Sequence, residues 1–215
     1  MAGEGCSIVG FIHVYMINNY YAIFTEQVDL IYKSGLYDRC QFIFVGCLGS
    51  KKDKLRLEHS VKEYSKYKFS AIGNRDMFEF YTLRYLKETV NNNPDFYGFY
   101  IHSKGVSWPN NVGGKHWRDY MNYYTLVRWK DNVTNLERGN DTCGVKLLGK
   151  QWPLHYSGNF FWFNSAYVKK LQEIDSLNMK NRNNAEFWIC SGRRVRAATL
   201  CQKFVDYNTK GKFKP

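Results

Sequence analysis

Three continuous apolar runs constrain the fold of this chain more than any other feature. They are Ser7–Met16 (SIVGFIHVYM), Gln41–Leu48 (QFIFVGCL) and Phe96–Ile101 (FYGFYI), each rich in β-branched or aromatic residues. Short runs of this kind predict buried strands. The segments Tyr21–Ser34 and Arg75–Val90, by contrast, carry apolar residues at helical spacing. Strands that alternate with helices predict an α/β fold, with a mixed, mostly parallel central sheet flanked by helices.

The rest of the chain gives weaker signals of the same kind. Further helices are expected at Leu57–Tyr67, at Lys115–Leu136, at Ala185–Cys190 and from a cap at Ser165 to Ile174, and further strands at Lys68–Ile72, Asp141–Leu148 and Tyr156–Phe163. The stretch Gly49-Ser-Lys-Lys is expected to be a loop. No internal repeat and no low-complexity linker interrupts the 215 residues. That length suits one domain, so we predict a single domain over residues 1–215.

The net charge of +12 indicates attraction to an anionic partner. The candidates are nucleic acid, a lipid surface and the phosphates of a small ligand. The Lys and Arg residues are scattered along the chain rather than gathered in a basic tail, which favours an ordinary basic surface. A single-stranded nucleic-acid-binding domain remains an alternative, because the aromatic content of 18% would also supply rings that stack on bases.

The cysteine pattern bears on the cellular compartment. None of the six cysteines forms a C-x-x-C pair, so a zinc site is not expected. Several lie in apolar runs, where a free thiol behaves as a small hydrophobic group. We find no signal-peptide pattern and no apolar stretch of 18 residues. The sequence therefore predicts no membrane segment and a reducing, cytoplasmic location.

Polar side chains stand at the ends of two of the apolar runs. His13 and Tyr15 close the first run, and His102, Ser103 and Lys104 follow FYGFYI directly. Ligands of open α/β sheets bind beyond the carboxyl ends of the strands. These five residues are therefore candidate ligand-binding residues, and Lys104 suits a diphosphate because its ammonium is a compact positive charge. For His13 and Tyr15 the plain alternative is a place in the core.

A third polar group interrupts a later aromatic run. It comprises His155, Ser157, Gly158 and Asn159. Ser157 and Asn159 are expected on one face of a strand, and Gly158 permits close approach of a sugar or a phosphate to the backbone. The turn Gly113-Gly114-Lys115 enters a helix and also suits a phosphate. Neither a P-loop nor a G-x-G-x-x-G motif is present, so a P-loop or classical dinucleotide site is not expected.

The order of several short motifs resembles a known enzyme family. The motifs are R-D-x-x-E-x-x-T-L-x-x-L (residues 75–86), Y-I-H-S-K-G (100–105), W-R-x-Y-M (117–121), H-Y-S-G-N-F-F-W (155–162) and E-F-W-I (186–189). Together they cover nearly the whole chain. In this order they resemble the GT-A-type nucleotide-sugar glycosyltransferases. The likeness is to a group of bacterial and large-virus domains that includes the N-terminal glycosyltransferase domain of a chlorovirus protein.

The resemblance implies a GT-A-like (Rossmann-like) fold and a glycosyltransferase activity. The donor would be a UDP-sugar, the transferred group a hexose or deoxyhexose such as glucose or rhamnose, and the acceptor a glycan hydroxyl on a viral or surface glycoprotein. Such a domain can also form the N-terminal part of a longer protein, in the cytoplasm of the host cell if it is viral. Relatives hold manganese with a D-x-D motif, whose place His102-Ser103-Lys104 takes here. The candidate manganese ligands are therefore His102, His155 and Asp76.

The resemblance also assigns roles to single residues. Tyr15 and Asp76 would bind the nucleoside, supported by His13 and Arg75. The diphosphate would be contacted by His102, Lys104 and His155, with Ser103 as a further binding candidate. The sugar would be faced by Ser157, Asn159 and Glu186, and Gly158 would permit its close approach to the backbone. Glu186 is the first candidate for a catalytic base, and Asp141 and His155 are further catalytic candidates. Inversion and retention both remain open. Because D-x-D is missing, a catalytically inactive sugar-nucleotide-binding module is a further alternative.

Plain alternatives exist for two acidic residues of the first motif, and a further functional role is expected for one tryptophan. Asp76 would also suit the first turn of a helix, where the helix dipole favours a carboxylate. Glu79 would also pair with Arg75 at i,i+4 spacing. A flexible loop that carries Trp108 would close over the donor and exclude water.

Overall fold

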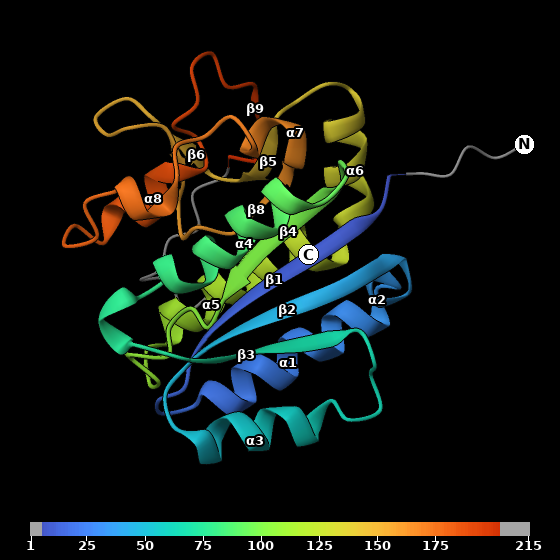
Figure 1. Ribbon diagram of the computed structural model, residues 1–215, viewed down its shortest axis with the longest axis vertical. Helices are drawn as coiled ribbons and strands as arrows, with labels where there is room; N and C mark the ends of the chain where they lie inside the picture. Colours follow the sequence, from blue (N-terminus) through green and yellow to red (C-terminus); the bar gives the residue numbers. More distant parts are fainter. Residues whose placement is uncertain (1–5, 203–215) are drawn as a thin grey trace, which may run out of the picture.

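A sheet of seven strands forms the centre of the computed structural model, which describes residues 6–202 (Figure 1). In spatial order the strands are β3 (Tyr67–Gly73), β2 (Cys40–Leu48), β1 (Ile8–Tyr15), β4 (Tyr97–His102), β8 (Phe161–Asn164), β5 (Thr142–Val145) and β9 (Ala197–Cys201). Only β8 runs antiparallel to its neighbours in this described sheet. The short strands β6 (Leu147–Leu148) and β7 (His155–Tyr156) form a separate antiparallel pair. The prediction of an α/β fold with a mostly parallel sheet is confirmed.

Helices cover both faces of the sheet. The first face carries α1 (Tyr20–Lys33), α3 (Lys51–Ser60), α5 (Val112–Asn122), the π-helical turn η2 (Tyr123–Val127) and α6 (Trp129–Glu137). The second face carries α4 (Phe80–Asn92), α7 (Ser165–Val168) and α8 (Asn183–Trp188). The remaining short helices are α2 (Leu36–Arg39), η1 (Arg75–Met77) and η3 (Ile174–Ser176). The strands thus form the middle of three layers.

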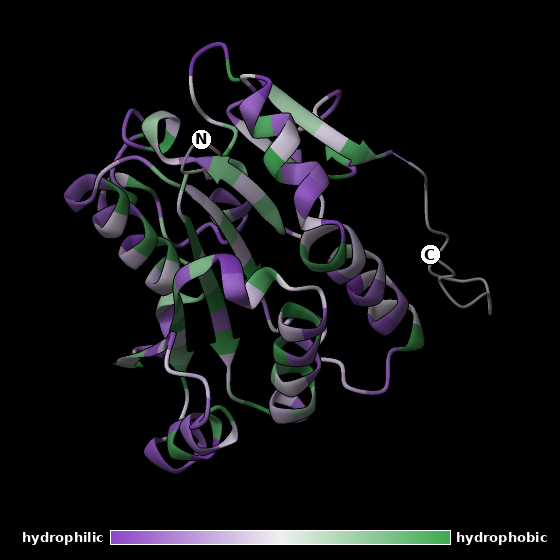
Figure 2. Cartoon of the chain, turned by 90° about the vertical axis from the view of Figure 1, so that its right-hand side faces the viewer, coloured by the Kyte–Doolittle hydropathy of each residue, from purple (hydrophilic) through white to green (hydrophobic). Residues whose placement is uncertain are grey.

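This layering explains why the strands are apolar throughout. In β1, Ile8, Ile12 and Val14 pack in the core of the first face, whereas Val9 and Phe11 pack in the core of the second. Strands that are buried on both faces lose the apolar–polar alternation of a half-exposed sheet. Figure 2 shows the result, with mostly green strands inside and helices banded in green and purple outside.

The strand order places a topological switch point beside β1. The chain runs from β1 to β2 and β3 on one side, and then returns to the other side of β1 with β4. Connections that leave two neighbouring strands in opposite directions open a crevice beyond their carboxyl ends. The register pairs His13 of β1 with His102 of β4 at this edge. Two of the predicted ligand-binding residues are therefore neighbours.

Two helix predictions were displaced. Helix α3 begins at Lys51, within the expected loop at residues 49–52, and it replaces the expected helix Leu57–Tyr67. It begins there because the Ser50 hydroxyl accepts a hydrogen bond from the Asp53 backbone N–H at 3.1 Å. The expected helix Lys115–Leu136 is divided by η2 into α5 and α6. It also begins earlier, because the Asn111 side chain caps α5 by accepting from the Gly114 backbone N–H.

Backbone conformations with positive φ divided three further predicted elements. The expected strand Tyr156–Phe163 breaks at Gly158 (φ 84°) and Asn159 (φ 57°), so Ser157 and Asn159 do not alternate on one strand face. Lys146 (φ 47°) separates β5 from β6 within the expected strand Asp141–Leu148. Phe78 (φ 46°) separates η1 from α4 within the expected helix Arg75–Val90. In addition, the cap of α7 is Asn164, and Ser165 is its first helical residue.

The structure bears on two sequence-based expectations, which concern membrane-spanning helices and the state of the cysteines. No helix within residues 6–202 has the length and hydropathy needed to cross a bilayer. All six cysteines are free, and burial raises the pKa of Cys40, Cys47, Cys143 and Cys190 to about 12. These four thiols stay protonated at neutral pH and act as small core groups.

The close packing of α4 on β2 generates a stability prediction. A Cβ atom added at Gly46 would lie only 2.9 Å from Thr82 Cβ, so Gly46→Ala forces α4 away from the sheet. We expect the free energy of unfolding to fall by about 1–3 kcal/mol, measured by urea denaturation. Gly114→Ala in α5 is the control, because its Cβ would meet nothing closer than 3.6 Å. Equal stability of the two variants would contradict the packing.

Candidate functional site

A cavity of about 460 Å³ lies at the switch point of the sheet. Its lining includes His13 and Tyr15 from the end of β1, Leu48 from the end of β2 and His102 from the end of β4. The other lining residues are Arg75, Phe78, Glu79, Ser103, Lys104, Gly105, Val106, Ser107, Trp108, Asn111, Gly114, Arg182 and Glu186. This is the position where open α/β sheets bind ligands, and the volume is that of a small-molecule site.

A second cavity, of about 410 Å³, adjoins the first. The two cavities share Lys104, Asn111, Gly114 and Glu186 as lining residues, and the second adds Trp117, Ser157 and Gly158. Lys104 and Glu186 therefore lie between the two spaces. A ligand in the first cavity and a ligand in the second would meet at these two side chains.

Glu79 lines the first cavity from the N-cap position of α4, and its side chain bonds to other residues rather than to the start of the helix. Its Oε2 accepts hydrogen bonds from Asn159 Nδ2 at 2.6 Å and from the Tyr100 hydroxyl at 3.3 Å. Its Oε1 lies 3.9 Å from His102 Nδ1. On the other side, His13 Nδ1 and the Thr82 hydroxyl of α4 are 2.8 Å apart. The start of α4 thus joins the ends of β1 and β4.

The ionisation of this group follows from its burial. Burial lowers the pKa of His13 to about 4, although the Glu79 carboxylate acts in the opposite direction. Burial also lowers the pKa of His102. For Glu79, burial raises the pKa, but His102, His13 and the Asn159 hydrogen bond together bring it below its ordinary value. At neutral pH the base of the cavity therefore holds one carboxylate between two uncharged imidazoles.

The turn after β4 is bonded to the end of β1. The Ser103 backbone N–H donates to the His13 carbonyl at 2.9 Å, and the Ser103 hydroxyl accepts from the Tyr15 backbone N–H at 3.0 Å. His102 Nε2 lies 2.9 Å from the Gly158 carbonyl and donates to it, because a carbonyl oxygen can only accept. These bonds hold the backbone beside Lys104, which lines both cavities just after the end of β4.

Three cationic side chains line the first cavity, namely Arg75, Lys104 and Arg182. The Arg182 guanidinium lies over the Phe78 ring, 4.4 Å from its centroid. Phe78 has φ 46° and ψ −141°, which is a strained conformation for a bulky residue. Strain of this kind is concentrated at functional sites. The bend at Phe78 lets Arg75 of η1 and Glu79, at the N-cap position of α4, line the same cavity.

The structure leaves four predicted site residues outside both cavities, namely Asp76, Asp141, His155 and Asn159. Asp76 is exposed on η1, where its backbone N–H donates to the Asn74 side chain. The His155 ring packs edge-on against Phe187, and its Nδ1 lies 2.7 Å from the Pro153 carbonyl. Asp141 lies before the start of β5, at the opposite edge of the sheet, because β5 runs in the same direction as β4.

Gly158 and Asn159 have roles that a strand model did not predict. A Cβ atom at Gly158 would lie 2.6 Å from Met121 Sδ of α5. The glycine therefore lets α5 pack closely against this turn, whereas the sequence suggested close approach of a sugar or a phosphate. Asn159 is fully buried and holds Glu79 rather than facing a sugar. Ser157, by contrast, lines the second cavity.

The residues present do not fit a manganese ion held by the protein alone. The proposed ligands His102, His155 and Asp76 are not brought together, and residues 6–202 contain no group of three His, Cys, Asp or Glu side chains that could hold a metal. Glu79, the carboxylate nearest to His102, already accepts two hydrogen bonds. The charge of a diphosphate here would fall on the cationic side chains instead.

Some lining residues were not assigned to the site from sequence. Glu79 was left open between a place in the site and a pairing with Arg75, and its position at a helix start became clear only from the break at Phe78. Asn111 stands before Gly-Gly at a helix entry, and the rule for N-caps would have found it. Arg182 precedes α8 in a stretch without a motif, and no signal in the sequence points to it.

Comparison with known proteins yields one finding. A family model described as a domain of unknown function, DUF8361, matches residues 11–211. No curated protein matches the chain.

The buried imidazole of His13 generates a pH prediction. Below pH 6.5 the unfolded chain binds a proton at this residue, but the folded protein does not until about pH 4. The free energy of unfolding should therefore fall by roughly 2–3 kcal/mol between pH 7 and pH 4.5, as measured by urea denaturation. His13→Gln should flatten this dependence, and the exposed His59→Gln should not. An unchanged slope in His13→Gln would show that His13 titrates normally.

Proposed function

The chain belongs to the DUF8361 family, and we propose that it is a glycosyltransferase that binds a UDP-sugar in the first cavity. The observation that carries this proposal is the position of Lys104, on the turn after β4, at the mouth of a cavity at the switch point of the sheet. A mostly parallel sheet with one antiparallel strand is compatible with a GT-A-type fold. The motif order described above supports the same function.

In this proposal the nucleoside occupies the part of the cavity near β1 and β2. Tyr15 and Phe78 offer aromatic rings and Leu48 an apolar side chain to a base. Asp76 lies outside the lining, so the sequence-based assignment of this residue to the ribose receives no support from its position. Arg75 of the same short helix lines the cavity and is the better candidate for a contact to the nucleotide.

The diphosphate would lie near Lys104, between the two cavities. Arg75 and Arg182 add two guanidinium groups, which bind phosphate oxygens through paired hydrogen bonds. Asn111 and Gly114 place the N-terminus of α5 in the wall of both cavities, and a helix N-terminus favours an anion. These cationic groups, rather than a protein-held metal, would neutralise the diphosphate.

The transfer would occur where the cavities meet. The sugar and the acceptor hydroxyl would meet beside Glu186, with Ser157 in the second cavity. As a base, Glu186 would take the proton of the acceptor hydroxyl, while the oxygen of that hydroxyl forms a bond to the anomeric carbon. The bond from that carbon to the diphosphate breaks, and its electron pair leaves with UDP, stabilised by Lys104. This role corresponds to inversion; in a retaining transfer Glu186 would only hold sugar hydroxyls.

The acceptor and the location are part of the same proposal. The transferred group would be a hexose or deoxyhexose, with glucose and rhamnose as the first candidates, and the acceptor a glycan hydroxyl of a viral or surface glycoprotein. The six free cysteines are consistent with a reducing compartment such as the cytoplasm.

Calorimetry with UDP tests the donor site. We expect binding of UDP in the presence of EDTA, because cationic side chains supply the positive charge. Lys104→Ala should raise the Kd about 10- to 100-fold through loss of a charged contact. Lys33→Ala is the control, since its ion pair with Asp29 lies at the far end of α1. Binding that requires manganese would overturn the metal-free neutralisation. Equal affinity for GDP and CMP, or no binding of UDP, would overturn the proposed donor.

The same preparation distinguishes the alternative functions. A nucleic-acid-binding domain would bind single-stranded oligonucleotides with an affinity that falls steeply with salt, because many counterions are released. Steep salt dependence with an oligonucleotide together with no UDP binding would favour that class.

Turnover of a UDP-sugar tests the role of Glu186. We expect Glu186→Gln to lower UDP release at least 100-fold, because general-base catalysis contributes roughly 10²–10⁴-fold. The Kd for UDP should change little. UDP release would be followed with a set of UDP-hexoses and a glycan acceptor mixture. Wild-type protein that binds UDP but never releases it from a UDP-sugar above background would indicate the catalytically inactive module.

A further inference from the structure

We propose that Arg118 and Glu26 are positioning residues, which hold the turn of Lys104 in the conformation that presents its ammonium to the diphosphate. The inference rests on the proposed function for its ligand, but the geometry on which it depends belongs to the protein alone. Neither residue lines either of the two cavities of the candidate site, so their effect on a ligand there would be exerted through Lys104.

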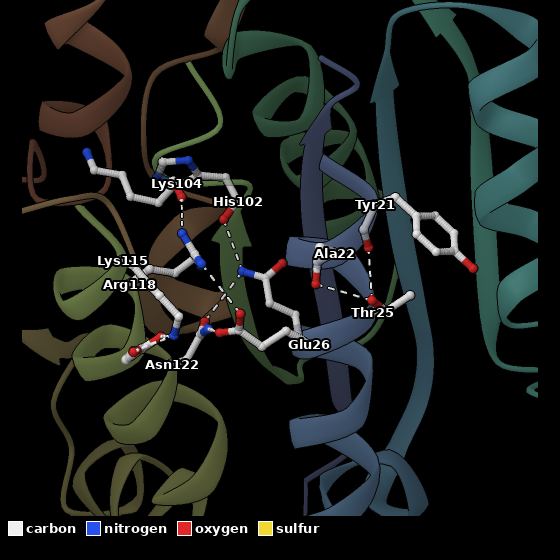
Figure 3. Close-up of polar contacts among 11 residues, drawn as sticks. Tyr21, Ala22, Thr25, Glu26, His102, Lys104, Lys115, Arg118 and Asn122 are labelled. Carbon is white, nitrogen blue, oxygen red and sulfur yellow. Dashed lines mark hydrogen bonds and ion pairs between the residues drawn. The ribbon is translucent and has the colours of Figure 1, made fainter. Parts of the chain in front are cut away.

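Arg118 connects the turn to the helices behind it. It lies on α5, is only 5% exposed, and its Nη1 donates to the Lys104 carbonyl at 3.0 Å. Its Nη2 reaches Oε2 of Glu26, on α1, at 3.4 Å. Figure 3 shows the guanidinium between the Lys104 carbonyl and the Glu26 carboxylate. One rigid, planar group thus bridges the turn and the helix layer.

A second set of bonds holds the residue before the turn. Gln27 Nε2, fully buried on α1, donates to the His102 carbonyl at 3.0 Å and to Asn122 Oδ1 at 3.4 Å. Asn122 Nδ2, on α5, donates to Glu26 Oε1 at 3.2 Å. Glu26 therefore links both arms, because each of its carboxylate oxygens accepts from a different residue of α5. The network fixes the carbonyls of His102 and Lys104 relative to α1 and α5.

The shape of the turn depends on the same contact. Gly105 has φ 86°, and a Cβ atom there would lie 3.3 Å from Arg118 Nη1. A side chain at this position would be strained and would crowd the guanidinium. Beyond the turn, Asn18 Nδ2 donates to the Val106 carbonyl at 2.9 Å. Side chains outside the turn thus donate hydrogen bonds to the backbone carbonyls at positions 102, 104 and 106.

These bonds hold the backbone of Lys104 and leave its ammonium available. Within residues 6–202 the Lys104 ammonium forms no hydrogen bond and no ion pair, although Glu79 and Glu186 line the same cavity. A cation with a fixed backbone and an available ammonium loses little freedom when it binds an anion. The Glu26 side chain is partly exposed, and exposed and buried ion pairs alike add little net stability, so positioning is the better account of the Arg118–Glu26 pair.

The first test uses the ligand-free protein. Arg118→Lys keeps the charge but replaces the planar fork of donors with a single nitrogen at a different reach. In this variant we expect amide hydrogen exchange at residues 103–106 to accelerate about 10-fold or more. Glu26→Gln is the milder variant, because its amide oxygen still accepts from Asn122. Lys115→Ala is the control on the same helix, since Lys115 pairs only with the nearby Asp119 among the described residues. Unchanged exchange in folded Arg118→Lys would overturn the inference.

The second test compares UDP with uridine. If the network positions Lys104, Arg118→Lys should weaken UDP binding about 10-fold and leave uridine binding unchanged, because only the diphosphate meets the turn. The Kd of UDP in the double variant of Arg118→Lys and Lys104→Ala should match that of Lys104→Ala alone. A loss of affinity that is equal for UDP and uridine, or that adds to the loss in Lys104→Ala, would indicate general disruption and would overturn the positioning role. Wild-type protein that does not bind UDP overturns the proposed donor, whereas the exchange experiment still decides the role of Arg118.

Discussion

The parallel pairing of β1 with β4 is the interaction on which the candidate site depends. It places His13 beside His102, and the layer of α4 then brings Glu79 close to His102. Because both strands are buried on both faces, a shift of one residue in register would exchange the residues that face α4 with those that face α1. In the observed register Ile8, Ile12 and Val14 enter one core, and Val9 and Phe11 enter the other. The packing of the sheet thus fixes the geometry of the cavity.

Charge in the site is arranged in layers. A carboxylate and two uncharged imidazoles lie at the base, and cationic side chains, Lys104 among them, line the cavity with Glu186. The base is tied into the sheet and α4 by hydrogen bonds, whereas the Lys104 ammonium has no bonded partner among the described residues. In such a site the hydrogen-bonded carboxylate and imidazoles are held in place, and the charged side chains that line the cavity face the ligand. In the proposed donor site, the negative charge of the leaving diphosphate would meet fixed positive groups.

Much of the fold and part of the site could be predicted from the chain. Buried strands, helical periodicity and polar strand ends follow from local composition, so His102, Ser103 and Lys104 were placed correctly at the edge of the sheet. Asp141 was not, because its place depends on the direction in which β5 enters the sheet. Arg182 was missed because a stretch with no local signal folds back over Phe78. The turn at Gly158 and Asn159 was missed because the aromatic run around it reads as one strand.

The sequence by itself determined the class of fold, since apolar runs without alternation have to be buried between two layers of helices. It also determined that a basic turn follows a central strand, because that pattern is local. Only the tertiary structure decided which distant residues join that turn. Glu79 comes from the N-cap position of α4, Arg118 from α5 and Glu186 from α8. The packing of these three helices depends on long-range contacts. Local patterns specify elements, but the packing of elements decides which side chains meet.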